Sequence, residues 1–501
     1  MAGVHKMMPK SFYCLLFTAY CLLLEAYPPG WSDDILLTPE DNKVRFYPDV
    51  DVDGFNNVWV VWDSGSWVNN TAEVLFSKRD SVGGVLIPET EVSTNVPYSY
   101  YPRIAVDGSN NIHIIWREIS PLGMGLGYAK LANDGSIIVP SHLVVSGAGG
   151  GESSMRPEMV MNKYKEVCIV WDEQPAGYNQ MDWTKLDSIG NPVITKLKVS
   201  LDTFYAYWPG IGVDSFGNSH LGYRLDIPAD QLVYTKLDKD GNILINNMLL
   251  DQSGSLPTII ADRSQNIHMV YPHLQTPYGP WVINYLKLNQ NGNIIIGPKT
   301  LYEFEYCGIP HMAMDSLQYL HIVWEDQTAS GTFPIYYTKI DTLGNFAIPP
   351  MQVVYPPYTP GGGLPRIAVD RNNHLHLIWV DNRIDPNTAD IFYKRGENEE
   401  TIKELAKLKA RNQPKISVFP NPFTTETKIA FSLSQETEKG KIEIFDILGR
   451  KVKEFSHLTN CQLSITWQGD DNVGNRLPSG IYFICLSVSK SNQSVPVVLL
   501  R

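Results

Sequence analysis

The chain has 501 residues and a formal net charge of −12, with 19% charged and 11% aromatic residues. This length exceeds what one hydrophobic core usually holds, so we expect two or more domains. The acidic balance and the absence of a basic stripe argue against nucleic acid as a partner.

The N-terminal segment has the pattern of a signal peptide. Lys6 and Lys10 form a short basic region, and the 14 residues that follow carry no charge. This run is shorter than an ordinary membrane span. The small residue at Ala26 predicts cleavage between Ala26 and Tyr27, which would remove residues 1–26 during export. The alternative is that the segment remains as an N-terminal membrane anchor.

The middle of the chain repeats one pattern seven times. A typical copy contains Pro102-Arg-Ile-Ala-Val-Asp107, then Asn111-Ile-His-Ile-Ile-Trp116, then Tyr128-Ala-Lys130 and Asp134-Gly135. Successive copies start 48 to 55 residues apart, at Pro48, Pro102, Pro157, Pro209, Pro257, Pro310 and Pro365. A period near fifty residues is typical of a repeat architecture.

Each copy contains four short apolar runs rich in Ile, Val, Tyr and Trp, which predicts strands rather than helices. Glycine turns before the fourth run fit tight hairpins. Four antiparallel strands per copy are the pattern of a β-propeller blade. The seventh copy ends after Lys394 without a fourth strand, and Asp34–Thr38 resembles an outer strand. We therefore expect an all-β, seven-bladed propeller over residues 31–396, closed by its N-terminal strand so that no edge is unpaired.

Six of the seven residues that directly follow the repeat prolines are polar, the exception being Gly210; there the first strand of each blade is expected to line a central channel. The seven residues are Asp49, Arg103, Glu158, Gly210, Thr258, His311 and Arg366. Tyr47, Tyr101 and Tyr207 lie close by in sequence and are suited to stack on sugar rings. Aromatic faces beside carboxylate and guanidinium groups suit carbohydrate. The alternative is that these residues only solvate a water-filled channel.

Catalytic and metal-binding alternatives have weaker support. Asp49 and Glu158 are a carboxylate pair of the kind that glycosidases use, although most acidic pairs are not catalytic. Asp49, Asp51 and Asp53 resemble a calcium loop, but an extended strand would spread them apart. Calcium is the one cofactor that the sequence leaves open. Histidines that recur once per copy lie too far apart for one zinc ion and are predicted to be structural, namely His113, His220, His268, His321 and His376.

After the repeats the character of the chain changes. Residues 397–414 are highly charged and lack strand alternation, which predicts a linker. Strand patterning returns over residues 415–501, a second domain. Cys461 and Cys485 both fall in this domain and are candidates for a disulfide in an oxidising compartment.

The C-terminal domain carries a series of motifs in a fixed order. They are Val418-Phe-Pro-Asn-Pro-Phe423, Thr427-Lys-Ile-Ala-Phe431, Ile442–Val452, Trp467-Gln-Gly-Asp470, Pro478-Ser-Gly-Ile-Tyr-Phe483 and Val497-Val-Leu-Leu-Arg501. This order resembles the type A C-terminal sorting domain of type IX secretion. The positions that carry the resemblance are Pro420, Asn421, Pro422, Gly449, Arg450, Gly480 and Arg501. It implies an Ig-like sandwich that the type IX translocon reads after signal-peptide export. Its destination would be the cell surface or the extracellular space; the alternative is an ordinary Ig-like accessory module.

The repeats themselves resemble BNR-like, sialidase-related propeller repeats of secreted bacterial proteins, through the pattern that runs from Val106 to Trp116. A sialidase needs an arginine triad, a Tyr–Glu nucleophile pair and an acidic Asp. Only Arg103 and Arg366 occupy matched positions, so the activity is not predicted. We expect an exported propeller that binds a glycan or a protein partner. The alternatives are a glycoside hydrolase or lyase, and a structural adhesion protein.

Overall fold

The computed structural model describes residues 30–39, 41, 43–66, 71–94, 98–120, 123–146, 155–174, 179–201, 205–226, 230–276, 279–304, 308–327, 331–355, 363–385, 387–397, 415–432, 440–458, 464–488 and 491–501. Every regular element in these segments is a strand, which confirms the all-β class. The signal peptide, its cleavage site and nearly all of the linker lie outside them and stay predictions. None of the described segments contains a helix that is long and apolar enough to cross a membrane.

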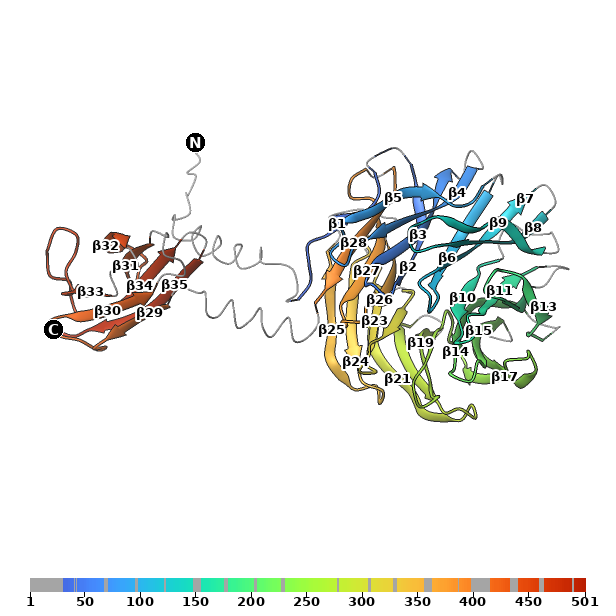
Figure 1. The fold of residues 1–501 in the computed structure, drawn as a ribbon. Helices are drawn as coiled ribbons and strands as arrows, with labels where there is room; N and C mark the ends of the chain where they lie inside the picture. The colour runs from blue at the N-terminus through green and yellow to red at the C-terminus, as the bar shows by residue number, and fades with distance from the viewer. Residues whose placement is uncertain are drawn as a thin grey trace, which may run out of the picture. The chain divides into compact units, whose positions relative to one another are not determined.

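The chain divides into two compact units, one spanning Tyr27–Asn398 and one that contains Glu399–Arg501. In the larger unit each repeat copy becomes an antiparallel set of strands in chain order (Figure 1). The first two copies are joined into one sheet by a single parallel pair, Ala72 with Tyr98. Their strands are β2 (Arg45–Val52), β3 (Val58–Ser66), β4 (Thr71–Arg79), β5 (Val85–Glu91), β6 (Tyr98–Val106), β7 (Ile112–Ser120), β8 (Gly123–Leu131) and β9 (Ile137–Ser146).

The third to sixth copies each form a separate four-stranded sheet. These sheets are β10 (Glu158–Met161), β11 (Val167–Glu173), β12 (Gln180–Leu186) and β13 (Pro192–Lys198); β14 (Ala206–Val213), β15 (Ser219–Asp226), β16 (Asp230–Leu237) and β17 (Ile243–Asp251); β18 (Thr258–Ala261), β19 (Ile267–Leu274), β20 (Trp281–Leu288) and β21 (Ile294–Phe304); and β22 (His311–Met314), β23 (Leu320–Glu325), β24 (Ile335–Ile340) and β25 (Phe346–Val354).

The seventh copy supplies three strands, and the N-terminal segment supplies the fourth. The sheet contains β26 (Gly363–Val369), β27 (Leu375–Asp381), β28 (Asp390–Gly396) and β1 (Ile35–Leu36). Ile35 pairs with Tyr393, and Leu36 pairs with Phe392. The prediction that an N-terminal strand completes the last sheet is confirmed.

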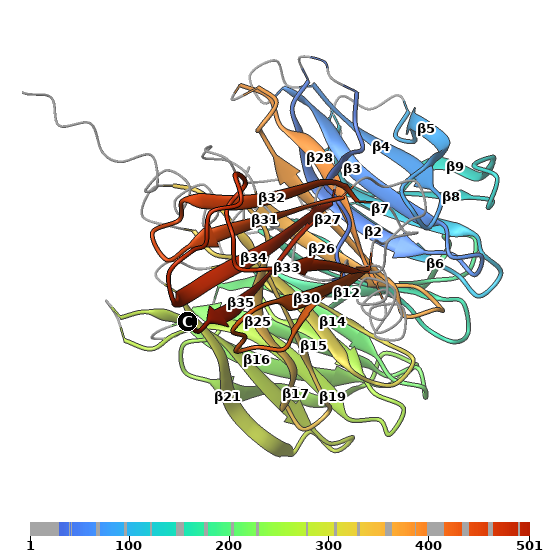
Figure 2. The ribbon, with the colours of Figure 1, turned by 90° about the vertical axis from the view of Figure 1, so that its left-hand side faces the viewer.

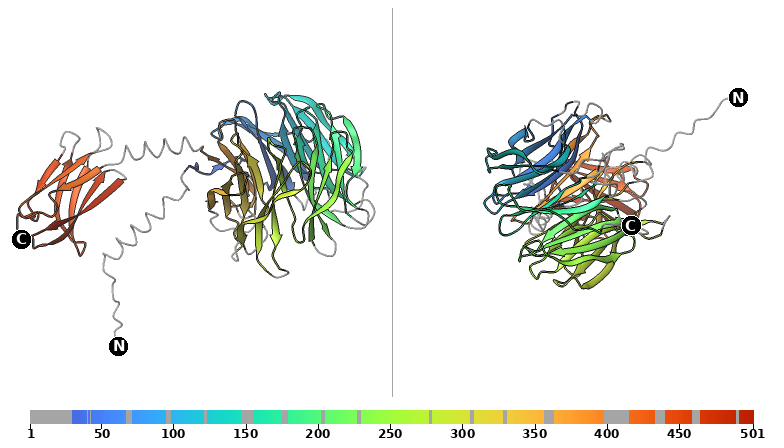
Figure 3. Two further views of the ribbon diagram at one scale, coloured as in Figure 1. Left: turned by 90° about the horizontal axis from the view of Figure 1, so that it is seen from below. Right: turned by 90° about the vertical axis from the view of Figure 1, so that its right-hand side faces the viewer.

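The hydrophobic core of the larger unit lies between neighbouring sets of strands. One cluster joins Trp59 on β3 to Ile112 on β7. Another joins Trp62 on β3 to Ile378 on β27, so the first and last copies share a core. Accordingly β2, the first strand of the first copy, packs beside β6 and β26, the first strands of the second and seventh copies. Figure 3 shows these strands from two further directions, and Figure 1 shows β26 to β28 (orange) beside β2 and β3 (blue).

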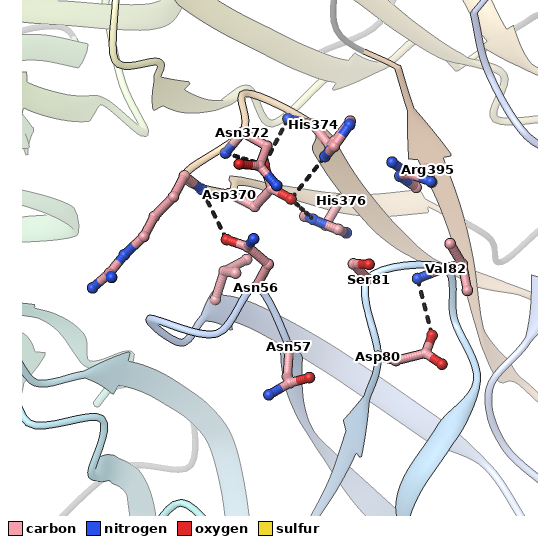
Figure 4. A network of polar contacts seen from close by, with 12 residues as sticks. Asn56, Asn57, Asp80, Ser81, Val82, Asp370, Asn372, His374, His376 and Arg395 are labelled. Atoms are coloured by element: carbon pink, nitrogen blue, oxygen red, sulfur yellow. Dashed lines mark hydrogen bonds and ion pairs between the residues drawn. The ribbon is translucent and has the colours of Figure 1, made fainter. Parts of the chain in front are cut away.

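Side-chain hydrogen bonds also join the turns between the first and second strands of neighbouring copies. In each, an Asn or Gln side-chain oxygen accepts a backbone N–H from a neighbouring turn. The pairs are Gly54 with Asn110 (2.6 Å), Ser215 with Gln265 (3.0 Å), Arg263 with Gln318 (3.2 Å), Ser316 with Asn373 (3.0 Å) and Arg371 with Asn56 (3.2 Å). The last pair joins the seventh copy to the first, at the junction drawn in Figure 4. The five acceptors have φ values of 61° to 67°, a region that favours Asn over most residues.

The repeated histidines are buried inside their own sheets. In the second copy His113 lies 2.9 Å from the Tyr128 hydroxyl through Nδ1 and 3.4 Å from Asp107 through Nε2. The same Asp–His–Tyr arrangement recurs at His220, His268 and His321, and His376 differs only in that its Nε2 lies 3.6 Å from Asp370 Oδ2. The prediction of structural histidines is confirmed. Cys168 replaces histidine in the third copy and is fully buried, as expected for a small core residue.

The smaller unit contains two sheets that share one core (Figure 2). The first sheet consists of β29 (Lys415–Phe419), β30 (Thr427–Ser432) and β33 (Ser464–Trp467); the second consists of β32 (Lys451–Leu458), β31 (Gly440–Asp446), β34 (Gly480–Val488) and β35 (Ser491–Leu499). Trp467 from the first sheet packs with Ile444 and Ile484 from the second, all fully buried. Cys485 carries a free thiol. Cys461 lies outside the described residues, so a pairing between them is not observed.

Candidate functional site

A cavity in the larger unit is lined by residues next to the repeat prolines. It consists of two adjoining hollows of about 80 and 150 Å³. The residues of the predicted set that line one or both hollows are Tyr47, Tyr101, Arg103, Glu158, Thr258, His311 and Arg366. Asp49 and Tyr207 do not line them. The structure therefore brings most of the predicted set together, while ligand binding by that set stays a prediction.

The charged centre of the cavity is an ion-pair network around Glu158. Arg103 donates to it twice, from Nε to Oε2 at 2.9 Å and from Nη2 to Oε1 at 2.7 Å. Nη2 of Arg366 donates to Oε1 at 3.4 Å. Burial acts to raise the pKa of Glu158, but the charges of Arg103 and Arg366 outweigh it and lower this pKa to about 2. Glu158 is therefore a permanent anion, and the two-point contact fixes the guanidinium of Arg103.

Asp49 lies behind this network. Its Oδ2 accepts the backbone N–H of Ile104 at 3.0 Å, and its Oδ1 lies 3.9 Å from Nε of Arg366. Burial raises the pKa of Asp49, against the opposing charge of Arg366. Because its pKa is lowered, Glu158 is not suited to be the general acid of a glycosidase pair.

Other residues that follow a repeat proline also connect neighbouring sheets. Thr258 Oγ1 donates to the carbonyl oxygen of the next repeat proline at 2.8 Å. His311 Nδ1 accepts the N–H of Ile367 at 3.2 Å. Burial lowers the pKa of His311 well below its usual value, so the ring is neutral and carries its proton on Nε2. A Cβ at Gly210 would lie 1.9 Å from the carbonyl oxygen of the next repeat proline, so only glycine fits there.

Aromatic rings and a third arginine form one wall of the cavity. The ring centroids of Tyr47 and Tyr101 are 4.0 Å apart, and their hydroxyls are 3.3 Å apart. The guanidinium carbon of Arg156 lies 5.4 Å from the centroid of Tyr101, within range of a cation–π contact. Arg156 has no ion-pair partner in the part of the chain that the structure describes. It is thus a cavity cation without an ion pair among the described residues; its backbone N–H donates to Asp172 Oδ1 at 2.8 Å, and the charges of the two side chains attract each other.

Sequence reasoning missed Arg156 and Trp208, both of which line the cavity directly before a repeat proline. Tyr207 is not among the lining residues, whereas Trp208, one residue later, is. Trp208, Tyr47 and Tyr101 have φ values between 48° and 54°, and strand pairing shifts register around them. A proline within a strand marks such a bulge. The repeat prolines could therefore have shown that the residues directly before them leave the regular strand alternation.

The three aspartates of the calcium-like loop bind separate partners. Asp51 Oδ2 accepts the N–H of Val106 at 2.8 Å, while Asp53 Oδ1 accepts the N–H of Asn57 at 2.9 Å and closes its own turn. Asp49 binds a different strand. Over the described segments, no group of three or more His, Cys, Asp or Glu side chains is arranged to hold a metal ion. The geometry gives the calcium hypothesis no support.

Comparisons with known proteins bear on each unit. Residues 417–499 match the family model described as secretion system C-terminal sorting domain. The C-terminal unit is a sorting domain. It indicates handling by the type IX machinery and export across the membrane to the cell surface or the extracellular space. The comparison with curated proteins found no match.

Several solved structures are similar to this chain. One is a protein of unknown function from Dyadobacter fermentans, with a TM-score of 0.49 and 10% identity, covering 74% of this chain and 100% of that chain. An α-L-arabinofuranosidase from Fusarium graminearum has a TM-score of 0.45 and 10% identity, covering 74% and 98%. A polysaccharide lyase described as an ulvan lyase has a TM-score of 0.46 and 9% identity, covering 75% and 98%.

Several signature residues of the sorting domain hold its fold together. Asn421, between Pro420 and Pro422, donates from Nδ2 to a β35 carbonyl at 2.9 Å and accepts a β35 N–H at 2.8 Å. Arg501 donates from Nη2 to the carbonyl oxygen of Gly469 at 3.0 Å. These contacts tie the first and last segments of the sorting domain to its sheets.

Proposed function

We propose that the larger unit is a closed, seven-bladed β-propeller whose cavity binds the acidic group of a glycan outside the cell. The ring is supported by β1, which completes the seventh set of strands, and by the core that the first and last copies share. The bond between Arg371 and Asn56 at the same junction supports it further. We also propose that the sorting domain is an Ig-like sandwich, because its two sheets enclose one core.

The observation that carries the binding proposal is the position of Arg156 in the cavity wall. Arg103 is paired with Glu158, whereas Arg366 lies near both Glu158 and Asp49. Arg156 is left without an ion pair among the described residues, and it lies over the ring of Tyr101. A carboxylate or sulfate on a sugar would complete this arrangement with charge-assisted hydrogen bonds, while the tyrosine rings cover the sugar face.

The size of the cavity limits what enters it. Hollows of about 80 and 150 Å³ are smaller than the roughly 300–1,000 Å³ typical of sites that enclose a whole small molecule. We therefore expect one acidic substituent to enter, with the rest of the glycan outside. The positive φ values of Tyr47, Tyr101 and Trp208 support a functional role, because such strained residues cluster at binding sites.

The test compares the wild type with Arg156→Ala on polygalacturonate and dextran sulfate as acidic probes and dextran as a neutral probe. Loss of a charged hydrogen bond worth about 1.5–3 kcal/mol should weaken acidic binding by about tenfold or more. Arg224→Ala is the matched control, because Arg224 lies 4.9 Å from the ring of Trp208 but does not line the cavity. Arg103→Ala is less informative, since it would remove the main ion-pair partner of the buried Glu158 and could destabilise the fold.

Each outcome has a distinct meaning. Selective loss in Arg156→Ala, with Arg224→Ala unchanged, supports the proposal. Equal binding by wild type and Arg156→Ala contradicts it. Release of sugar product would instead favour a glycosidase or lyase. Binding of an acidic protein but of no glycan would favour a protein partner.

A further inference from the structure

One turn of the sorting domain exposes large apolar side chains that its fold does not use. The turn joins β31 to β32, and Ile447 and Leu448 are 70% and 66% exposed. Asp446 fixes its shape, since Oδ1 accepts the N–H groups of Leu448 and Arg450, both at 2.9 Å. Gly449 supplies the left-handed residue, with φ of 74°. The apolar side chains are thus not needed to form the turn.

These side chains line a hollow together with two other segments. The hollow is about 570 Å³, and its lining includes Val473, which is 86% exposed, and Ile481, which is 45% exposed. The turn that carries Val473 is held in place, because the N–H of Asn472 donates to Val452 O at 3.1 Å. On the other side, the Tyr482 hydroxyl donates to Pro478 O at 2.8 Å. The hollow is therefore a preformed feature with an apolar rim.

Residues of the sorting-domain motifs fall into two groups. Asn421 and Arg501 make hydrogen bonds within the sorting domain, so their place in the motifs follows from folding. Ile447 and Leu448 lie within the motif Ile442–Val452, yet their side chains face solvent. Folding alone does not require large apolar residues there, whereas recognition by another molecule does.

We propose that this hollow, rimmed by Ile447, Leu448, Val473 and Ile481, is where a component of the type IX secretion machinery docks with an apolar side chain or segment. The match of residues 417–499 to a secretion sorting domain names the partner, and the exposed apolar rim gives the chemistry of its contact. The inference rests on the sorting domain and not on the cavity of the larger unit, so the two proposals fail independently.

The experiment measures secretion of the full chain in a bacterium that exports by this route. Leu448→Ser is the test variant, and Leu317→Ser is a closely matched control in the larger unit. Leu317 is 68% exposed, and its N–H donates to Oδ1 of Asp315 at 2.9 Å, as that of Leu448 does to Asp446. The extracellular fraction of Leu448→Ser should fall about tenfold, with the cell-associated protein still folded by limited proteolysis.

A second measurement keeps the result independent of folding. A photo-crosslinking residue at position 448 of the full chain should give an adduct with a machinery component, and one at position 317 should not. Normal secretion of Leu448→Ser would overturn the proposal, and so would an equal loss in Leu317→Ser. Crosslinking to a second copy of this chain alone would also overturn it.

Discussion

At the scale of single residues, the repeated histidine is a neutral connector. Asp107 has a pKa lowered to about 2 by its hydrogen bonds, despite its burial, so it must accept from His113 Nε2. Nδ1 of His113 then accepts from the Tyr128 hydroxyl. Burial, assisted by the charge of Lys130, lowers the pKa of His113 to about 4. The native state therefore resists protonation of this ring.

This arrangement predicts a loss of stability in acid. The unfolded chain protonates the histidine near its ordinary pKa of about 6.5, so between about pH 6.5 and 4 it binds more protons than the native state. Stability from His113 is complete above about pH 6.5 and falls as the pH drops towards 4, by roughly 3 kcal/mol for a shift of this size. His113→Gln should weaken that dependence, as measured by urea unfolding at pH 7, 5.5 and 4. An identical pH dependence in the wild type and His113→Gln would show that the buried ring does not couple protonation to folding.

At the scale of elements, hydrogen bonds between neighbouring turns explain why an amide residue such as Asn56 occupies the turn between the first and second strands of a copy. Asn56 has a φ of 66°, and its side-chain oxygen accepts the N–H of Arg371 at 3.2 Å (Figure 4). Asparagine satisfies both demands, since it tolerates this conformation and offers an acceptor. Four further pairs of neighbouring turns are joined in the same way.

Substitutions at Asn56 separate the two demands. Asn56→Gly keeps the conformation but removes the acceptor, and should cost about 1 kcal/mol of unfolding free energy. Asn56→Ala should cost about 1 kcal/mol more, because alanine is strained at this φ. Asn56→Asp keeps an acceptor and should lie closest to the wild type. Denaturant titration measures all three, and equal stability of Asn56→Gly and wild type would remove the proposed role of the bond.

Strand positions were predictable because the repeat imposes them. The alternation of apolar runs and turn residues marks the strands of each copy, and the missing fourth strand of the last copy points to Asp34–Thr38. The pairing of β1 with β28 is then expected, because it leaves no unpaired strand edge on the last copy. The sorting domain was predictable from the order of its motifs, and its match confirms it.

The cavity was only partly predictable, because its lining depends on bulges. Tyr207 stands two residues before Pro209, whereas Tyr47 and Tyr101 directly precede their prolines; Trp208 is therefore the equivalent residue, and it lines the cavity. Arg156 has no polar repeat equivalent in the other copies, which carry Tyr, Trp, Leu or Ile before the proline. Asp49 follows its proline as predicted, yet its hydrogen bond to Ile104 takes it behind the cavity surface. Such details arise from contacts between copies, which a single copy does not encode.

At the scale of the larger unit, the N-terminal segment is the tie between the two ends of the repeat array. The N–H of Leu37 donates to Ile391 O at 2.8 Å. Asp34 lies 2.8 Å from Nζ of Lys394, whose side chain is completely buried. Trp31 packs edge-on against the ring of Tyr337, at 5.2 Å between centroids. Copies that are adjacent in sequence are linked by the chain, but no peptide bond links the first copy directly to the last. These contacts hold the first and last copies together instead.

Removing residues 31–40 should therefore destabilise the whole larger unit and not only its edge. The deletion exposes the backbone edge of β28 and removes the carboxylate of Asp34 that pairs with Lys394. Loss of one partner of a buried ion pair alone lowers the free energy of unfolding by about 3–5 kcal/mol. We expect the melting temperature to fall by about 10 °C or more, measured by calorimetry on the mature chain. Asp33→Ala, which alters an exposed neighbour, should leave it unchanged. An unaltered melt after the deletion would mean that the shared core of Trp62 and Ile378 holds the first and last copies together without the strand.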